Sequence, residues 1–161
     1  MIWRVLLLCF LPMPALALSC IPYGIQDAYL DAVESPEAYV IVRGKLTFDT
    51  SMLPKVDWNQ QDKVPPVTNI SARISGVHLG SFGKRASFSK DITLSIRCFG
   101  PWCGGAHEGD VVAFLRRDDT RYVLETDPCG GFLFAAPNAE HMRSLQQCLD
   151  GKSCKSTTFP E

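Results

Sequence analysis

The clearest pattern in the chain is an alternation of apolar and polar residues over positions 86–98. Because successive side chains of a strand point to opposite faces, this stretch is predicted to be a strand with one face in the core. The inward set is Phe88, Ile92, Leu94, Ile96 and Cys98, and the outward set is Ser89, Asp91, Thr93, Ser95 and Arg97.

Two earlier stretches also have the composition of strands. Residues 38–48 (AYVIVRGKLTF) are rich in β-branched and aromatic side chains, and Gly44 marks an expected bulge or bend. Residues 67–79 keep one apolar parity up to Gly76 and switch to the other beyond it. Such a switch is typical of a bulge at the corner of a barrel.

The second half of the chain predicts a hairpin. Residues 110–116 and 120–126 are its two strands, with the turn at 117–119 (Arg-Asp-Asp). Between the first two strands of the domain lies a long polar loop, residues 49–66, which contains Trp58 and several prolines.

Helices are predicted near both ends of the domain. Residues 27–33 have partial helical spacing, with Asp27 as the N-cap and Pro36 ending the helix. Asn138 is predicted to cap a final helix that Gly151 terminates. The apolar stripe of that helix consists of Met142, Leu145, Cys148 and Leu149.

These elements together predict a mainly β fold. Five bent strands remove their exposed sheet edges most simply by closing into a small barrel of the OB type. We therefore expect a five-stranded OB-type Greek-key barrel with a short N-terminal helix and a C-terminal helix. A seven-stranded sandwich would need more strand candidates than the chain contains.

The first 19 residues have the layout of a secretory signal. Arg4 precedes an apolar run over 5–11, which is too short for a membrane span of roughly 20 residues. Cleavage is predicted after Ala17 or after Ser19. The chain then divides into a signal peptide (1–19), a folded domain (20–150) and a flexible tail held by a local disulfide (151–161).

The mature chain is close to neutral. The full sequence has 16 basic and 17 acidic residues, and loss of Arg4 with the signal leaves 15 and 17, a net charge of −2. A near-neutral chain with interspersed signs has no electrostatic footprint for nucleic acid. No nucleic-acid partner is therefore expected.

Six cysteines remain after the signal, and an even number in an exported chain indicates three disulfides. Six cysteines allow 15 pairings. We expect Cys98–Cys103 and Cys148–Cys154 as local loops, with Cys20–Cys129 tying the start of the domain to its last strand. In the chain-entropy model the long bridge contributes about 4–5 kcal/mol and each short one about 2 kcal/mol.

The candidate catalytic patterns are all incomplete. Residues 102–104 (Trp-Cys-Gly) begin like a thioredoxin motif, but Ala106 stands where the second cysteine belongs. Residues 107–108 (His-Glu) begin like a zinc-protease helix, but Val111 replaces the second histidine. We therefore predict no enzyme, no metal and no cofactor.

Two segments are candidate partner-binding elements. The loop 49–66 offers Trp58, since an exposed tryptophan is a common interface anchor. The alternative is that Trp58 and Leu53 fold over the barrel end and plug it. The other segment begins the domain and consists of Cys20, Ile21, Pro22 and Tyr23.

The chain also has a recognisable order of features. Cys20 leads the domain, residues 26–46 join a short helix to a Val/Ile strand, and residues 109–114 (GDVVAF) begin a hairpin that ends in 126–129 (TDPC). This layout, over about 20–148, resembles netrin-like modules and the N-terminal domain of the tissue inhibitors of metalloproteinases, which share the OB barrel. The family's Cys-x-Cys start is Cys-Ile-Pro in this chain.

The resemblance implies a specific inhibitory chemistry. In those inhibitors the amine and carbonyl of the leading cysteine chelate the protease zinc, which accepts neutral nitrogen and oxygen donors. Carried over, Cys20 would be the chelator, Ile21 would enter the specificity pocket, and the loop 49–66 would flank the cleft. This requires cleavage after Ser19, because any preceding residue turns the Cys20 nitrogen into an amide.

The sequence therefore predicts a non-catalytic binding module of netrin-like OB fold, secreted or periplasmic, with a protein partner such as a protease or an envelope component. One alternative is the metalloprotease inhibitor that uses Cys20. Another is an envelope-anchored lipoprotein, in which a lipid on Cys20 would provide the membrane contact.

Overall fold

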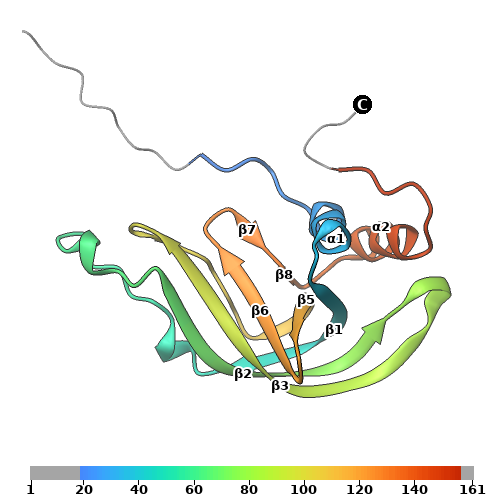
Figure 1. Ribbon diagram of the computed structural model, residues 1–161, viewed down its shortest axis with the longest axis horizontal. Helices are drawn as coiled ribbons and strands as arrows, with labels where there is room; N and C mark the ends of the chain where they lie inside the picture. The colour runs from blue at the N-terminus through green and yellow to red at the C-terminus, as the bar shows by residue number, and fades with distance from the viewer. Residues whose placement is uncertain (1–18, 157–161) are drawn as a thin grey trace, which may run out of the picture.

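The computed structural model describes residues 19–156, which form a mainly β fold with two α-helices (Figure 1). The expected mainly β class is therefore confirmed, whereas the predicted signal peptide lies almost entirely outside the described residues. The long strands are β1 (Ala38–Phe48), β2 (Val67–Leu79), β3 (Arg85–Phe99), β5 (Gly109–Asp118) and β6 (Arg121–Asp127); the short ones are β4 (Trp102–Cys103), β7 (Gly130–Gly131) and β8 (Leu133–Ala135). The helices are α1 (Ile25–Glu34) and α2 (Ala139–Leu149).

The five long strands pair into a closed ring. Strand β2 lies between β1 and β3, and β5 lies between β1 and β6, all in antiparallel pairs. A parallel pairing of β3 with β6, from Thr93↔Val123 to Ile96↔Thr126, closes the ring. Because every long strand then has two neighbours, none of the five presents an unpaired edge along its whole length.

The ring encloses the larger core of the molecule. The inward residues predicted for β3 are all buried, and they pack with the inner faces of β1, β2, β5 and β6. One predicted outward residue, Ser95, is also buried, at 8% exposure. It lies opposite Glu125 on β6. The parallel pairing therefore buries a residue that the alternating pattern predicted to be exposed.

A glycine pair brings the backbones of β1 and β2 close together. Gly44 and Gly76 are direct cross-strand partners. A Cβ on either residue would overlap the backbone of the facing strand, in one case the carbonyl oxygen of Arg43. The bulge expected at Gly44 and beyond Gly76 is absent, because the ladders of β1 and β2 run through both positions without an inserted residue. The two glycines instead allow the backbones to approach more closely than any side chain permits.

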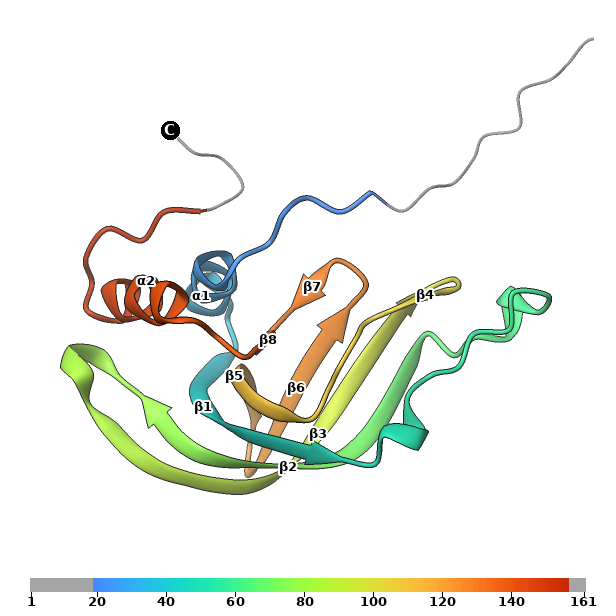
Figure 2. The ribbon, with the colours of Figure 1, turned by 180° about the vertical axis from the view of Figure 1, so that it is seen from behind.

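The two helices form a second layer against β1 and β5 (Figure 2). Strand β5 is buried on both faces: Val111, Ala113 and Leu115 face the ring interior, and Val112 and Phe114 face the helices. This explains the unbroken apolar run in β5, which differs from the alternation in β3.

The predicted helices are present, with one correction. Asn138 caps α2, and its Oδ1 accepts a hydrogen bond from the His141 backbone N–H at 2.9 Å, as expected. Helix α1 begins earlier than predicted, with Gly24 as its N-cap. Asp27 is therefore not the cap; it lies in the first turn and its Oδ2 accepts the Gly24 N–H at 2.7 Å. This is the reciprocal half of a capping box.

The second correction concerns the β5–β6 hairpin. Its turn is 119–120, because Asp118 already pairs with Arg121 in the ladder. The prediction of 117–119 placed the turn too early, since the charged Arg117 and Asp118 resemble loop residues but pair as strand residues. The helices of residues 19–156 include none that is long and apolar enough to cross a membrane.

Candidate functional site

Three disulfides fix the domain. They join Cys20 to Cys129, Cys98 to Cys103 and Cys148 to Cys154, which are the pairs expected from the sequence. Three disulfides fit an oxidising compartment, either extracellular or periplasmic. Cys103, the cysteine of the incomplete redox motif, is bonded to Cys98 and closes a structural loop.

Four segments lie together along one edge of the molecule, and we call them the apolar ridge: residues 20–23, 49–67, 99–102 and 127–130. The Cys20–Cys129 bond joins the first segment to the last, and the Tyr23 ring lies against Gly130. Gly104, just after the β4 tip, lies against the backbone of Asp127.

The remaining link joins the β4 tip to the long loop. The Cys98 N–H donates to the Pro66 carbonyl at 2.9 Å, which ties the end of β3 to the end of the loop. Figures 1 and 2 both show the β4 tip, β7 and the loop before β2 pointing toward the same edge. These links join segment 20–23 to 127–130 and the β3–β4 tip to the end of the loop, although the segments are far apart in the sequence.

Exposed apolar side chains concentrate on this ridge. Of the eight large hydrophobic residues that are exposed among residues 19–156, six belong to it. Since single exposed hydrophobic residues are normal on a surface, the clustering is the informative observation. The six are Ile21, Met52, Trp58, Val67, Phe99 and Trp102.

The tip of β3 and β4 carries two paired aromatic residues beside a disulfide. Phe99 pairs directly with Trp102, and Cys98 pairs with Cys103. Alternation along the two strands places the disulfide on one face, where Cys98 is buried, and the two aromatic side chains on the other, at 43% and 37% exposure. Sequence reasoning treated this segment only as a disulfide loop, although aromatic residues next to both cysteines were a usable signal.

The predicted partner-binding residues have different environments. Ile21 is 64% exposed and Pro22 is exposed, directly beside the bonded Cys20. Tyr23 is half-buried and its hydroxyl donates to Asp31 Oδ2 at 2.7 Å. Burial, with that hydrogen bond, raises the pKa of the Tyr23 hydroxyl above its ordinary value. The Tyr23 side chain therefore attaches the segment to helix α1, whereas the Ile21 side chain is exposed to solvent.

The apolar residues of the long loop were predicted either to anchor a partner or to cover the barrel end, and the structure separates the two cases. Leu53 packs against the core inside the ring. Trp58 is 62% exposed and follows the 3-10 turn Thr50–Met52 on a part of the loop that lies away from the core. The predicted plug is therefore wrong for Trp58, whereas Leu53 does pack against the core.

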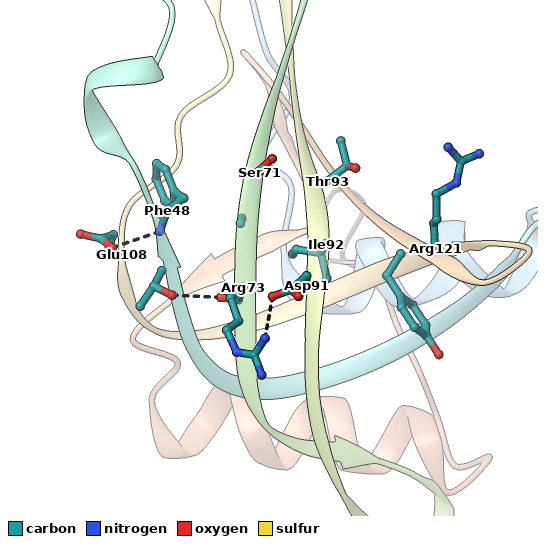
Figure 3. Close-up of a pocket in the computed structure, with 11 residues that line it drawn as sticks. Phe48, Ser71, Arg73, Asp91, Ile92, Thr93, Glu108 and Arg121 are labelled. Atoms are coloured by element: carbon teal, nitrogen blue, oxygen red, sulfur yellow. Dashed lines mark hydrogen bonds and ion pairs between the residues drawn. The ribbon is translucent and has the colours of Figure 1, made fainter.

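A separate groove of about 570 Å³ lies across the outer side of the ring, near the start of β6 (Figure 3). Figure 3 shows Arg73 and Asp91 pointing toward one another over β2 and β3, with Arg121 on one side and Glu108 on the other. The Arg73 and Asp91 side chains form an ion pair at 2.6 Å. Sequence reasoning did not identify this groove, because its residues come from separate strands.

Within residues 19–156, no three histidine, cysteine or carboxylate side chains are grouped so that they could hold a metal ion. Comparisons with protein-family models, with curated proteins and with solved structures find no match for this chain. Its functional interpretation therefore depends on the geometry of the ridge and the groove.

Proposed function

We propose that the protein is an exported, non-catalytic binding module with an OB-type barrel of netrin-like layout. The strand order of the ring, β1-β2-β3-β6-β5 and back to β1, supports the barrel assignment. Of the pairs in the ring, the one that joins β3 to β6 is parallel, as a five-stranded Greek-key barrel requires when its third strand meets its last. The disulfides support the export assignment.

The module binds a protein partner through the apolar ridge. The observation that carries this proposal is that six of the eight exposed large hydrophobic side chains of residues 19–156 lie in the four segments of the ridge. Exposed apolar clusters of this kind mark protein interaction sites, with aromatic residues as the usual anchors. Trp58, Phe99 and Trp102 are the aromatic members.

Disulfides hold three of the four segments of the ridge. Cys20–Cys129 joins segments 20–23 and 127–130, and Cys98–Cys103 closes the base of segment 99–102. A surface that is already rigid loses little conformational freedom on association, so more of the contact energy contributes to affinity. This distinguishes the ridge from an exposed but mobile loop.

The experiment compares matched aromatic variants. The oxidised protein would be used to capture partners from the envelope and secreted fractions of its source cells, with quantitative mass spectrometry as the readout. Trp102→Ala should weaken recovery and, in titration with the captured partner, lower affinity about 30-fold, the effect of losing one aromatic anchor. Phe82→Ala is the control, because Phe82 is exposed but lies outside the ridge. A partner lost equally with both variants, or with neither, would contradict the proposal.

A metalloprotease inhibitor is the second candidate, and the Cys20 geometry favours it. The disulfide to Cys129 holds the Cys20 backbone in place, and the neighbouring Ile21 is 64% exposed. An open zinc position accepts an amine and a carbonyl from such a residue. Ile21 would then occupy the adjacent specificity pocket.

The mature N-terminus decides between the alternatives. If N-terminal sequencing starts at Cys20, zinc chelation by its free amine remains possible. A start at Leu18 excludes it. A Cys20 blocked by a lipid indicates an anchored lipoprotein. Inhibition would then be measured against a panel of zinc proteases. Ile21→Gly should lose potency, and equal potency of this variant would contradict the pocket contact. An extra alanine before Cys20 should abolish inhibition while leaving the ridge intact.

A further inference from the structure

The outward-facing side of the sheet formed by β1, β2 and β3 carries an excess of basic side chains. The registers of the two strand pairs place these side chains on one face, alternating with residues of the core. The basic ones are Arg43, Lys45, Arg73, Arg85 and Arg97, and the acidic one is Asp91. Because the full chain has a formal net charge of −1, this face is much more positive than the protein as a whole.

Ion pairs neutralise only half of the arginines on the outer side of the ring. The three pairs there are Arg73 with Asp91, Arg116 with Glu125 and Arg121 with Asp118. Among residues 19–156, no carboxylate forms an ion pair with the other three arginines of this side, which are Arg43, Arg85 and Arg97. Their guanidinium groups are therefore available to an external anion.

Two of these unpaired arginines line a single groove, which we call the arginine groove. Its volume of about 310 Å³ is at the lower end of the range of roughly 300–1,000 Å³ usual for small-ligand sites. Arg43 belongs to β1 and Arg85 to β3, on either side of β2. The other residues that line the groove are Gly44, Gly76, Val77 and Asp110.

The glycine pair holds one of the two arginines in place from below. Gly44 and Gly76 are cross-strand partners and line the groove with backbone atoms only. A Cβ on Gly76 would overlap the carbonyl oxygen of Arg43, so the backbone that carries this arginine lies directly against β2. No side chain from either glycine occupies the space between Arg43 and Arg85.

Two unpaired guanidinium groups in one groove favour an anion with oxygen atoms on several sides. A guanidinium is always charged and donates through a planar fork. The two oxygens of a carboxylate match one fork, whereas a phosphate or sulfate group has oxygens for two forks that approach from different strands.

The charge of the groove also favours an anion. Asp110 lines the groove and opposes an anion, but its direct partner in the β1–β5 register is Lys45. Arg43, Arg85 and Lys45 together exceed Asp110 by two formal charges. A hollow with an excess of one sign of charge raises the local concentration of ions of the opposite sign.

We propose that the arginine groove binds a tetrahedral oxyanion, free or carried as a phosphate or sulfate monoester, with the guanidinium groups of Arg43 and Arg85 donating to its oxygens. The proposal does not depend on the apolar ridge, because the two surfaces share no residue. The groove beside Arg73 does not support the same inference, because Asp91 already pairs with that guanidinium (Figure 3).

The test is titration of the oxidised, isotopically labelled protein at low ionic strength, where exposed charges are least screened. The probes are phosphate, sulfate, glucose 6-phosphate and acetate, and the readout is the amide chemical shifts. Phosphate or sulfate should bind with a dissociation constant of about 1 mM. The shift changes should centre on residues 43–45, 76–77, 85 and 110. Acetate should bind about tenfold more weakly, because it matches one fork only.

The ester probe identifies the source of the oxyanion. If glucose 6-phosphate binds at least as tightly as phosphate, the groove accepts a phosphate group carried by a larger ligand. If it binds much more weakly, the groove takes the free ion. Both results require binding that depends on the two arginines.

Variants assign the binding to the groove. Arg43→Gln and Arg85→Gln should each weaken binding about tenfold, since each removes a charge-assisted donor, and should fold normally because both side chains are exposed. Asp110→Asn should instead tighten binding about threefold, because it removes the opposing charge. Arg97→Gln is the matched control on the same face of β3, outside the groove, and should leave affinity unchanged.

Three outcomes would overturn the proposal. The first is that neither phosphate nor sulfate shifts the groove amides at millimolar concentration. The second is that acetate binds as tightly as both, which would indicate a general attraction of anions. The third is that Arg97→Gln weakens binding as much as Arg85→Gln does, which would mean that the charge of the whole face, and not the groove, holds the anion.

Discussion

The two ends of the molecule hold their exposed aromatic residues by different means. At the apolar ridge, Phe99 and Trp102 are fixed by a disulfide across the tip that carries them. At the opposite end, Phe82 lies on the β2–β3 turn, in the 3-10 turn Ser81–Gly83 beside α2. Hydrogen bonds hold that turn: the Phe82 N–H donates to Asp150 Oδ1 at 2.7 Å, and Gln146 donates to the Gly80 carbonyl at 3.3 Å.

This difference separates a structural contact from a candidate interface. Phe82 is the most exposed large hydrophobic side chain of the described residues, at 78%, yet no other exposed apolar residue lies on its turn. Its backbone N–H connects two elements of the same chain, which explains the geometry of the turn. At the ridge, disulfides instead hold the backbone beside Ile21, Phe99 and Trp102. Clustering and fixation together, rather than exposure alone, are the grounds on which the ridge is proposed as the binding surface.

The largest expected effect comes from cutting the long bridge of the ridge. Cys20→Ala with Cys129→Ala opens a loop of 109 residues and should lower the free energy of unfolding by about 4–5 kcal/mol, measured by urea denaturation. The matched control at the helix end, Cys148→Ala with Cys154→Ala, opens a loop of 6 residues and should cost about 2 kcal/mol. Equal losses would mean that the ridge has no special covalent support.

The next effect concerns the close approach of the β1 and β2 backbones. Gly76→Ala should destabilise the protein by about 3 kcal/mol, because the new Cβ would overlap the β1 backbone. Gly105→Ala is the control, since nothing lies within 4 Å of a Cβ there. Thermal unfolding of the two variants measures the difference, and a Gly76→Ala protein as stable as its control would refute the close approach.

The hydrogen-bonded end should be the more sensitive to acid. Hydrogen bonds from Gln146 and from the Phe82 N–H lower the pKa of Asp150 below its ordinary value. Such a group stabilises the fold above its unfolded pKa of about 3.9, and this contribution is lost as pH falls through the lower folded value. Melting temperatures measured from pH 6 to pH 2 should therefore fall less for Asp150→Asn than for the parent protein. Parallel curves would exclude this carboxylate as the support.

The smallest effect tests the strain at Phe82. Its φ of 55° lies in the left-handed region, which is unfavourable for a bulky residue. Phe82→Gly should raise the free energy of unfolding by about 0.5–1 kcal/mol, because glycine adopts this conformation freely and little buried surface is lost. Gly83→Ala, at φ 70°, should lower it by about 1 kcal/mol. Urea denaturation of both variants would show opposite shifts.

Much of the fold follows from local pattern. The ends of β1 and β2 coincide with the predicted ranges, because Pro36 and the prolines at 65–66 interrupt runs of β-branched residues. Strands β4, β7 and β8 were not predicted. Two or three residues are too few for an alternation to be visible, and they pair only because longer strands lie beside them.

The candidate sites were predicted less well than the fold. The N-terminal segment and Trp58 were identified by residue type, and the expected pairing of Cys20 placed the segment correctly on Cys129. Phe99 and Trp102 were missed as a surface pair, because their shared face depends on how a short strand pairs. The groove was missed entirely, since Arg73 and Asp91 become neighbours only through the register of β2 with β3.

The sequence by itself determined the inner face of β3, the ranges of β1 and β2, and which sulfur atoms are available to bond. These properties depend on neighbours within a few residues, so they are visible in the order of side chains. The tertiary structure decided which loops share an edge and which polar side chains share a groove. Those juxtapositions depend on strand register and on closure of the ring, which join residues that are distant in the chain.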